Sequence, residues 1–480
     1  MKKKQKENRL GKAMGIFLLF AMSCFAFSCK DDKVDSKSHD PSKPVEITDF
    51  SPKNGSARTR LFIYGKNFGT DISQIMVKIG GVDAKVIGSN GECIYCVVPQ
   101  RAFDGTIEVS IGGENETPVM AEATEKFSYE RKSLVTTLCG TVSETGEYTV
   151  TDGPFEKAGF KYTTWLSFDP HNPNYLYAVE DYAGIRLIDL EKREVSTLIT
   201  CGQMNIARPR TIAWSPDGNT MYISNDQGSE DGISNIALRR EENFLRAEVA
   251  TRSRSCNGAA VHPVNGEIYY SQWEGGSIWR DDLNDDKPRE ELFKIWANSY
   301  EIGIIFHPTG DYAYMMGHNF NAIVKSTYNW EKKQLEVPQP FVGEFGQAGW
   351  IDGVGTQARI ESPWQGVFVK NEEYVKQGKN DVYDFYFADR ATHSIRKITP
   401  EGMLVTIAGR GSEGLDSNVW GYVDGDLRKE ARFNQPRGIA YDEKSAIFYV
   451  ADSENRRIRT ITIENETDTV EADQEAQVEP

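Results

Sequence analysis

A six-residue pattern recurs six times between residues 131 and 465, and it constrains the fold more than any other feature of the sequence. Each copy begins with an apolar residue and a tyrosine, continues through three variable positions and ends in a polar or large residue. Successive tyrosines lie 45, 47, 45, 72 and 63 residues apart. A period of this size indicates similar small units that bury their apolar faces against their neighbours. The copies are 176–181, 221–226, 268–273, 313–318, 385–390 and 448–453.

The flanks of each copy predict short β-strands. An apolar run and a turn rich in proline and glycine precede the pattern, as at 214–218 and 306–310, and two more strand-like runs follow it. Four short strands per unit predict a β-propeller, and six copies predict six blades. The last unit lacks a fourth strand, but residues 134–140 parallel 403–409. We therefore expect the first strand of the ring to complete the sixth blade and to cover its edge.

An Asp-Gly element recurs between units, at 151–160, 351–366 and 423–440. The last copy, continued to Arg459, closely resembles an NHL repeat, and the resemblance is strongest in the fifth and sixth units. It implies a six-bladed NHL-type β-propeller over 131–465. We interpret the Asp-Gly pairs as turns or helix N-caps rather than as catalytic carboxylates.

Residues 44–130 contain about seven short strands separated by glycine and proline, which predicts a small β-sandwich. The Phe-Ser-Pro opening at 50–52 and the Gly-Lys-Asn-Phe-Gly turn at 65–69 resemble an IPT/TIG domain, an immunoglobulin-like fold. The resemblance implies a spacer or docking module, and the whole chain is predicted to be all-β. Cys93 and Cys96 have zinc-like spacing, but in a strand they face opposite sides, so we interpret them as small buried residues.

The first 28 residues are predicted to be a lipoprotein signal peptide. A basic segment is followed by an apolar run too short to span a bilayer comfortably, and the run ends at Cys29, the expected lipidation site. An ordinary secretory signal and lipidation at Cys24 are the alternatives. Residues 29–43 are predicted to form a flexible tether, and their acidic start resembles the export tag of outer-membrane lipoproteins. Residues 466–480 are predicted to be an acidic disordered tail.

The charge of the chain excludes one class of partner. The 480 residues include 55 Lys and Arg against 71 Asp and Glu, a net charge of -16. Removal of residues 1–28 leaves 49 basic and 70 acidic residues, or -21. Nucleic acid is therefore not an expected partner, because phosphate binding requires a basic surface.

Propeller geometry predicts where side chains can converge. The start of the first strand and the end of the second lie on the same face of every blade, because the two strands are antiparallel. Aromatic rings there can pack on sugars, and polar groups can bind hydroxyl pairs. A structural role, in which Asp ties a loop to its blade as in NHL repeats, stays open for these residues. The predicted ligand-binding residues are the platforms Trp273, His318 and Trp364, the hydroxyl or carboxylate partners Gln365, Asp389, Arg390 and Arg437, and Arg210 in the same ring.

The sequence supports a catalytic function less strongly than it supports ligand binding. It contains no nucleophile elbow, no His-Glu-x-x-His helix and no phosphate loop, so no catalytic residue and no cofactor is predicted. The alternative is a channel Ca²⁺ site held by Glu180, Asn225, Asp389 and Asp452, since oxygen ligands suit that ion. Six-bladed lactonase-like hydrolases use such a metal.

The complete architecture resembles the lipoproteins of starch-utilisation-like glycan-uptake systems. The resemblance implies a surface protein of the outer membrane that is lipid-anchored, faces the cell exterior and binds polysaccharide or oligosaccharide without cleaving it. A neighbouring outer-membrane transporter is the implied partner. Two alternatives stay open: a hydrolase or lyase acting on sugars or lactones, and a protein–protein scaffold.

Overall fold

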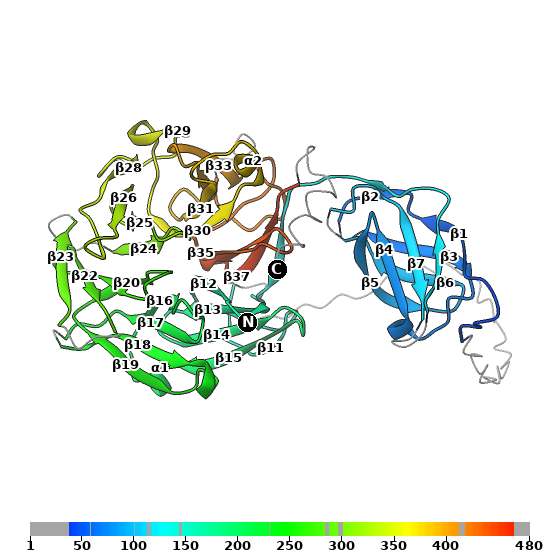
Figure 1. The fold of residues 1–480 in the computed structure, drawn as a ribbon, viewed down its shortest axis with the longest axis horizontal. Helices are drawn as coiled ribbons and strands as arrows, with labels where there is room; N and C mark the ends of the chain where they lie inside the picture. Colours follow the sequence, from blue (N-terminus) through cyan, green and yellow to red (C-terminus); the bar gives the residue numbers. More distant parts are fainter. Residues whose placement is uncertain are drawn as a thin grey trace, which may run out of the picture.

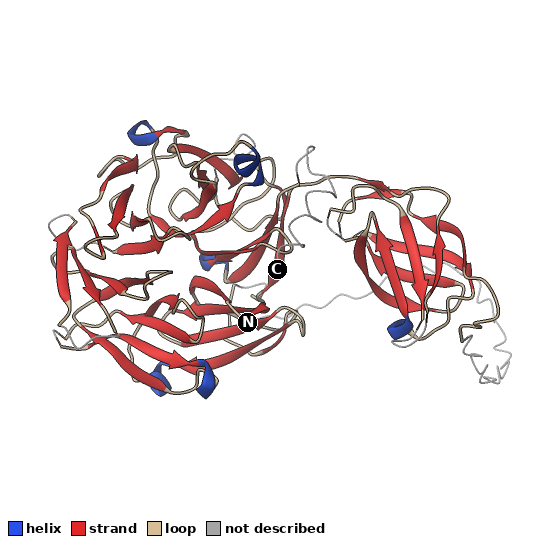
Figure 2. Cartoon of the chain, in the orientation of Figure 1, coloured by secondary structure: helices blue, strands red, loops and turns tan. Residues whose placement is uncertain are grey.

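The computed structural model describes residues 38–464, except 58, 100, 113–116, 144–145, 230, 284–287, 296–300 and 412–417. The predicted signal peptide, Cys29, most of the tether and the predicted tail at 466–480 lie outside the described residues. Two bodies are visible, a small sandwich and a ring of blades (Figure 1). Nearly all regular structure is β-strand (Figure 2). In the described part of the chain, no helix is both long and apolar enough to cross a membrane.

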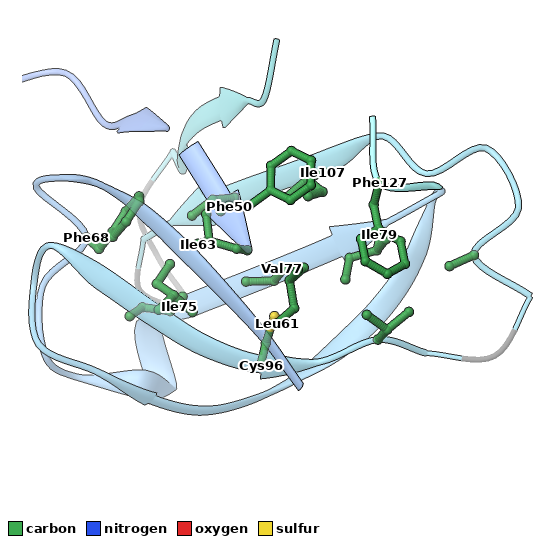
Figure 3. Packing of buried hydrophobic residues seen from close by; sticks show 14 of the residues in the cluster. Phe50, Leu61, Ile63, Phe68, Ile75, Val77, Ile79, Cys96, Ile107 and Phe127 are labelled. Carbon is green, nitrogen blue, oxygen red and sulfur yellow. The ribbon is translucent and has the colours of Figure 1, made fainter. Parts of the chain in front are cut away.

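The N-terminal body is a sandwich in which one sheet has the strand order β1-β3-β6-β5-β4-β7-β8. Alternation along β3 buries Leu61 and Ile63 and leaves their neighbours outside, as period-two side-chain placement requires. These residues join Phe50, Phe68 and other apolar side chains in one core (Figure 3). The strands are β1 (Glu46–Ser51), β2 (Asn54–Gly55), β3 (Arg60–Lys66), β4 (Ile75–Ile79), β5 (Val82–Ser89), β6 (Cys93–Val97), β7 (Ile107–Ile111), β8 (Val119–Glu122) and β9 (Ser128–Tyr129), with the 3₁₀ helix η1 (Ile72–Gln74).

The second body is a β-propeller with six blades, as predicted. Blade one contains β12 (Thr163–Asp169), β13 (Asn172–Glu180), β14 (Gly184–Asp189), β15 (Glu194–Thr200) and the short β11 (Gly153–Pro154). Blade two contains β16 (Pro209–Trp214), β17 (Thr220–Asn225), β18 (Ile233–Arg239) and β19 (Ala247–Arg252). Blade three contains β20 (Cys256–Val261), β21 (Ile268–Gln272), β22 (Ser277–Asp281) and β23 (Glu290–Lys294).

The other three blades follow in chain order. Blade four contains β24 (Ile302–Phe306), β25 (Tyr312–Gly317), β26 (Ala322–Asn329), β27 (Gln334–Leu335) and β28 (Gln339–Gly343). Blade five contains β29 (Gly353–Val354), β30 (Pro363–Lys370), β31 (Tyr383–Asp389), β32 (Ser394–Ile398) and β33 (Met403–Gly409). Blade six contains β34 (Gly425–Asp426), β35 (Pro436–Asp442), β36 (Ile447–Asp452), β37 (Arg457–Thr462) and β10 (Leu134–Cys139). The helices are α1 (Cys201–Met204), α2 (Glu372–Lys376), η2 (Arg240–Glu242), η3 (Gly355–Gln357) and η4 (Ser453–Asn455).

The ring closes as the sequence predicts. Strand β10 pairs antiparallel with β37, with Leu134 opposite Thr462 and Val135 opposite Ile461. The first strand of the ring thus supplies the outer strand of the last blade. Val135 is fully buried in the apolar cluster between blades five and six, so closure is held by packing as well as by hydrogen bonds.

The recurring pattern on the second strands explains the packing of the ring. Neighbouring residues on a strand point to opposite faces, and both faces of a blade are covered by other blades. In every blade the apolar residue packs towards the preceding blade and the tyrosine towards the next one. In blade one, for example, Leu176 lies in the cluster with blade six, whereas Tyr177 lies in the cluster with blade two. The pattern therefore encodes contact between blades.

Glu464 joins the two bodies. Its carboxylate accepts hydrogen bonds from the Tyr129 hydroxyl at 2.5 Å and from the backbone N–H of Lys132 at 3.1 Å. The strand that leaves the sandwich and the end of β37 therefore meet at one point (Figure 1). On the other side of the sandwich, Asn67 binds the backbone of Asp40 and Lys43, so ordered contacts begin inside the segment predicted to be a tether.

Candidate functional site

Blades one, five and six each contain a buried arginine on the third strand that binds two acidic residues. In blade five, Arg396 donates to Asp389 at 3.0 Å and to Asp352 at 2.8 Å. Blade six repeats this arrangement with Arg459, Asp452 and Asp424, and blade one with Arg186, Glu180 and Asp152. The aspartate of each Asp-Gly pair also accepts the backbone N–H of a fourth-strand threonine, Thr406 in blade five. The Asp-Gly element is thus a tie between strands, not simply a turn or an N-cap.

This arrangement corrects the prediction for Asp389. The side chain is fully buried, and it also accepts the backbone N–H of Glu361 at 2.8 Å in the loop before β30. Burial raises the pKa of Asp389 to about 6, although Arg396 opposes the shift. Asp389 therefore fixes the structure of its own blade and is not exposed to a ligand.

The residues predicted as the alternative Ca²⁺ site share this structural role. They occupy the same position, the end of the second strand, in four different blades, and each accepts backbone N–H groups from the loop before the first strand of its own blade. Their side-chain oxygens thus bind the backbone of four separate loops. In the described residues, no three His, Cys, Asp or Glu side chains are placed to hold a metal ion. The four residues are Glu180, Asn225, Asp389 and Asp452.

Gln365 is also used within the fold. Its Oε1 accepts the backbone N–H of Leu166 at 2.9 Å and of Ile439 at 3.0 Å, and its Nε2 donates to the carbonyl of Leu166. The amide therefore joins the first strands of blades five, six and one. The prediction that Gln365 binds ligand hydroxyls is not supported, because this buried amide is already engaged.

The other predicted residues divide into a cluster and one separate tryptophan. We call the face where first strands begin the mouth face. There Trp364 of blade five stacks on His318 of blade four, with ring centroids 4.1 Å apart and an interplanar angle of 14°. Gly303 permits this approach, because a Cβ there would lie 3.1 Å from Nε2 of His318. Both rings are buried.

Three predicted arginines surround the Trp364 ring. Their guanidinium carbons lie 4.8 Å (Arg437), 5.4 Å (Arg210) and 5.5 Å (Arg390) from its centroid, distances typical of cation–π contacts. Arg437 is only 5% exposed and also lies 4.1 Å from the centre of the Tyr162 ring. The structure thus brings together five predicted residues from blades two, four, five and six. We call Arg210, His318, Trp364, Arg390 and Arg437 the mouth cluster.

Glu301 completes one side of the cluster, and sequence reasoning missed it. Its Oε1 lies 3.2 Å from Nη2 of Arg210, and its Oε2 lies 3.6 Å from Nδ1 of His318. Burial alone would raise the pKa of Glu301, but His318 and Arg210 outweigh it and hold the pKa well below its usual range. Burial lowers the pKa of His318, although Glu301 opposes the shift. Glu301 precedes β24 and lies outside the recurring pattern.

Two further mouth-face contacts were missed for the same reason. Tyr162 donates its hydroxyl to Glu454 at 2.9 Å beneath Arg437. Arg208 pairs with Asp181 and Asp226 between blades one and two. Tyr162 and Arg208 precede the first strands of their blades, just outside the positions that the strand pattern marks.

Two exposed aromatic rings lie on the mouth face outside the cluster. Trp273 follows β21 in blade three, is 36% exposed and has no aromatic contact with Trp364. Tyr182 follows β13 in blade one, is 60% exposed and packs 4.8 Å from the Arg208 guanidinium. Trp273 therefore stands apart from the other predicted residues but presents a ring to solvent, as a sugar platform requires. Tyr182 was not predicted.

Several buried polar atoms of the mouth face have no hydrogen-bond partner among the described residues. They are Nε and Nη1 of Arg437, Nε of Arg390, both ring nitrogens of His318 and Oδ1 of Asn257. Buried polar groups normally find a partner, because an unmade hydrogen bond is costly. A concentration of such atoms at one place therefore indicates a site for a polar ligand.

The opposite half of the channel is apolar. A cavity of about 380 Å³ is lined by the first strands of all six blades, with Trp165, Trp214 and Phe306 among its walls. The histidines at that end bind turns: Nε2 of His171 lies 2.8 Å from the carbonyl of Asp217.

Comparisons with known proteins agree with this architecture. The IPT/TIG domain family matches residues 44–129. An auxiliary nutrient binding protein from Bacteroides thetaiotaomicron VPI-5482 is 46% identical, with 88% of this chain and 99% of that chain covered and a TM-score of 0.67. An auxiliary nutrient binding protein from Bacteroides ovatus ATCC 8483 is 36% identical, with 89% of this chain and 100% of that chain covered and a TM-score of 0.70. A third protein, from B. thetaiotaomicron VPI-5482, is described as a putative phosphatase. It is 39% identical, with 89% of this chain and 99% of that chain covered and a TM-score of 0.67.

Curated relatives match only in part. NHL repeat-containing protein 2 of Bos taurus is 29% identical over 123 residues, and SUPPRESSOR OF QUENCHING 1 of Arabidopsis thaliana is 24% identical over 349 residues. The chain spans 15% and 27% of the lengths of these two relatives. Fold and sequence together define a class of protein, a TIG domain joined to a six-bladed propeller with NHL repeats. Within this class, the chain belongs to the family formed by the three Bacteroides proteins.

Proposed function

We propose that this protein is a lipid-anchored protein of the outer cell surface that binds a polysaccharide or oligosaccharide without cleaving it. The captured glycan would pass to a neighbouring outer-membrane transporter. The observation that carries the proposal is the mouth cluster, which contains buried polar atoms without a hydrogen-bond partner among the described residues and shares its face with exposed aromatic rings. Two close relatives described as nutrient binding proteins support a binding role.

The roles of the tryptophans in this site differ from those that the sequence predicted. His318 covers one face of Trp364 and three guanidinium groups surround the ring, so Trp364 holds polar groups in place instead of stacking on sugar. Trp273 and Tyr182 have the exposure that sugar stacking needs. We therefore assign the platforms to Trp273 and Tyr182 and the hydrogen bonds to the arginines.

A polysaccharide panel tests the proposed function. Mature protein without Cys29 is run through gels that contain each polymer, and the same mixtures are analysed for products. We expect retardation by one class of glycan and no products. Retardation by no polymer, or steady release of oligosaccharides, would contradict non-catalytic capture.

The aromatic platforms give a second prediction. Trp273→Ala and Tyr182→Ala are each expected to weaken binding of the best glycan about tenfold, the equivalent of about 1.4 kcal/mol, because a stacking surface is lost. Titration calorimetry measures the change. Trp330→Ala is the matched control, since this tryptophan is 45% exposed at the other end of blade four. An unchanged affinity in both platform variants would remove the platforms from the account.

An enzyme is the second candidate, because one relative of this family is described as a putative phosphatase. Arginine pairs bind phosphate oxygens well. Release of inorganic phosphate from phosphorylated sugars, measured with the same protein, distinguishes the two functions. Turnover that Arg437→Lys abolishes would favour the enzyme.

A further inference from the structure

Two arginines of the mouth cluster form no ion pair within the described part of the chain. Among the described residues, no carboxylate lies within 4.0 Å of a side-chain nitrogen of Arg390 or Arg437. Arg437 is almost fully buried, and two of its three guanidinium nitrogens have no hydrogen-bond partner. An uncompensated buried cation is costly, so proteins normally pair it.

The two guanidinium groups come from adjacent blades and face the same tryptophan. Arg390 follows β31 in blade five, and Arg437 lies at the start of β35 in blade six. Both lie within 5.5 Å of the Trp364 ring centroid. Burial lowers the pKa of Arg437, and the positive charge of Arg390 adds to the effect, whereas Tyr162 and Glu454 oppose it.

Four acidic groups of the mouth face contact residues other than Arg390 and Arg437. Glu301 faces Arg210 and His318, Glu454 accepts the hydroxyl of Tyr162, and Asp181 and Asp226 bind Arg208. None of them forms an ion pair with Arg390 or Arg437. Arg390 and Arg437 therefore place two positive charges beside Trp364, in a protein whose net charge is -16.

We propose that the glycan carries an anionic substituent, the carboxylate of a uronic acid, and that Arg390 and Arg437 bind it beside Trp364. Planar guanidinium groups bind the paired oxygens of a carboxylate with two parallel hydrogen bonds, which suits a site with unpartnered N–H groups. This inference rests on the proposed function. A sulfate ester on the sugar offers similar oxygens and is the other source of the same chemistry.

Three matched polymers test the inference in calorimetry: a uronic acid polysaccharide, the same polymer with its carboxylates reduced to alcohols, and a sulfated polymer. We expect the uronic acid polymer to bind at least tenfold more tightly than its reduced form, with an affinity that falls as salt rises. Equal binding of the native and reduced polymers would overturn the inference and leave the proposed function intact. Preference for the sulfated polymer would overturn the assignment to a carboxylate. Binding of no glycan would overturn both proposals.

Variants identify the residues responsible. Arg390→Gln is expected to remove most of the preference for the native over the reduced polymer, because it should weaken binding of the native polymer much more than binding of the reduced one. Arg437→Lys keeps the charge but loses the planar fork, so it should weaken binding of the native polymer and fold normally. The control is Arg239→Gln, whose side chain is paired with Glu248 at the opposite end of blade two. A preference that survives both Arg390→Gln and Arg437→Lys would refute the assigned site.

Discussion

Asp389→Asn is expected to lower the free energy of unfolding by about 3–5 kcal/mol, the usual cost of breaking a buried ion pair. Arg396 is fully buried, and its other contacts are Asp352 and two backbone carbonyls. Asparagine would leave part of the guanidinium charge uncompensated in a place that water does not reach. Urea unfolding of the mature protein measures the loss.

The same variant separates a structural residue from a ligand residue. Asp231→Asn is the control, because Asp231 is exposed and its side chain has no role in the ties between strands; it should change stability by less than about 0.5 kcal/mol. If Asp389→Asn kept full stability but lost glycan binding, the original prediction of a ligand role would be right and the structural assignment wrong.

Val135→Asp is expected to open the ring. Val135 has no exposed surface and packs in the cluster between blades five and six, in the strand that closes the propeller. An aspartate there places an unpaired charge in an apolar core and uncovers the edge of β37. We expect a loss of several kcal/mol, about 4 or more, together with aggregation on heating.

Thermal unfolding and soluble yield measure this second effect. Val150→Asp introduces the same charge at a residue that is 40% exposed after the closing strand, so it should behave like the unchanged protein. Equal melting temperatures for Val135→Asp and Val150→Asp would mean that β10 does not hold the ring together.

The strand pattern predicted the architecture well because it reflects packing. The apolar residue and tyrosine at 448–453 point to opposite faces of a blade that is covered on both sides, so the sequence must repeat wherever a blade repeats. Ring closure was predictable for the same reason, since residues 134–140 and 403–409 fill equivalent positions.

The binding residues were harder to predict because strand position does not show whether a side chain is already engaged. Asp389 and Arg390 are neighbours on the mouth face, yet Asp389 is engaged by Arg396 whereas Arg390 has no ion pair among the described residues. Arg396 lies seven residues further along the chain and Asp352 lies in a different loop, so only the folded chain shows the tie. Glu301, Tyr162 and Arg208 lie in connecting loops, where no repeat marks them.

A crystal structure of the mature protein with an oligosaccharide from the best-binding glycan tests the central claim most directly. We predict that the sugar lies on the mouth face, uncleaved, with its acidic group against Arg390 and Arg437 and a ring against Trp273 or Tyr182. An oligosaccharide bound to the sandwich or in the apolar half of the channel, with the mouth face unchanged, would contradict the account.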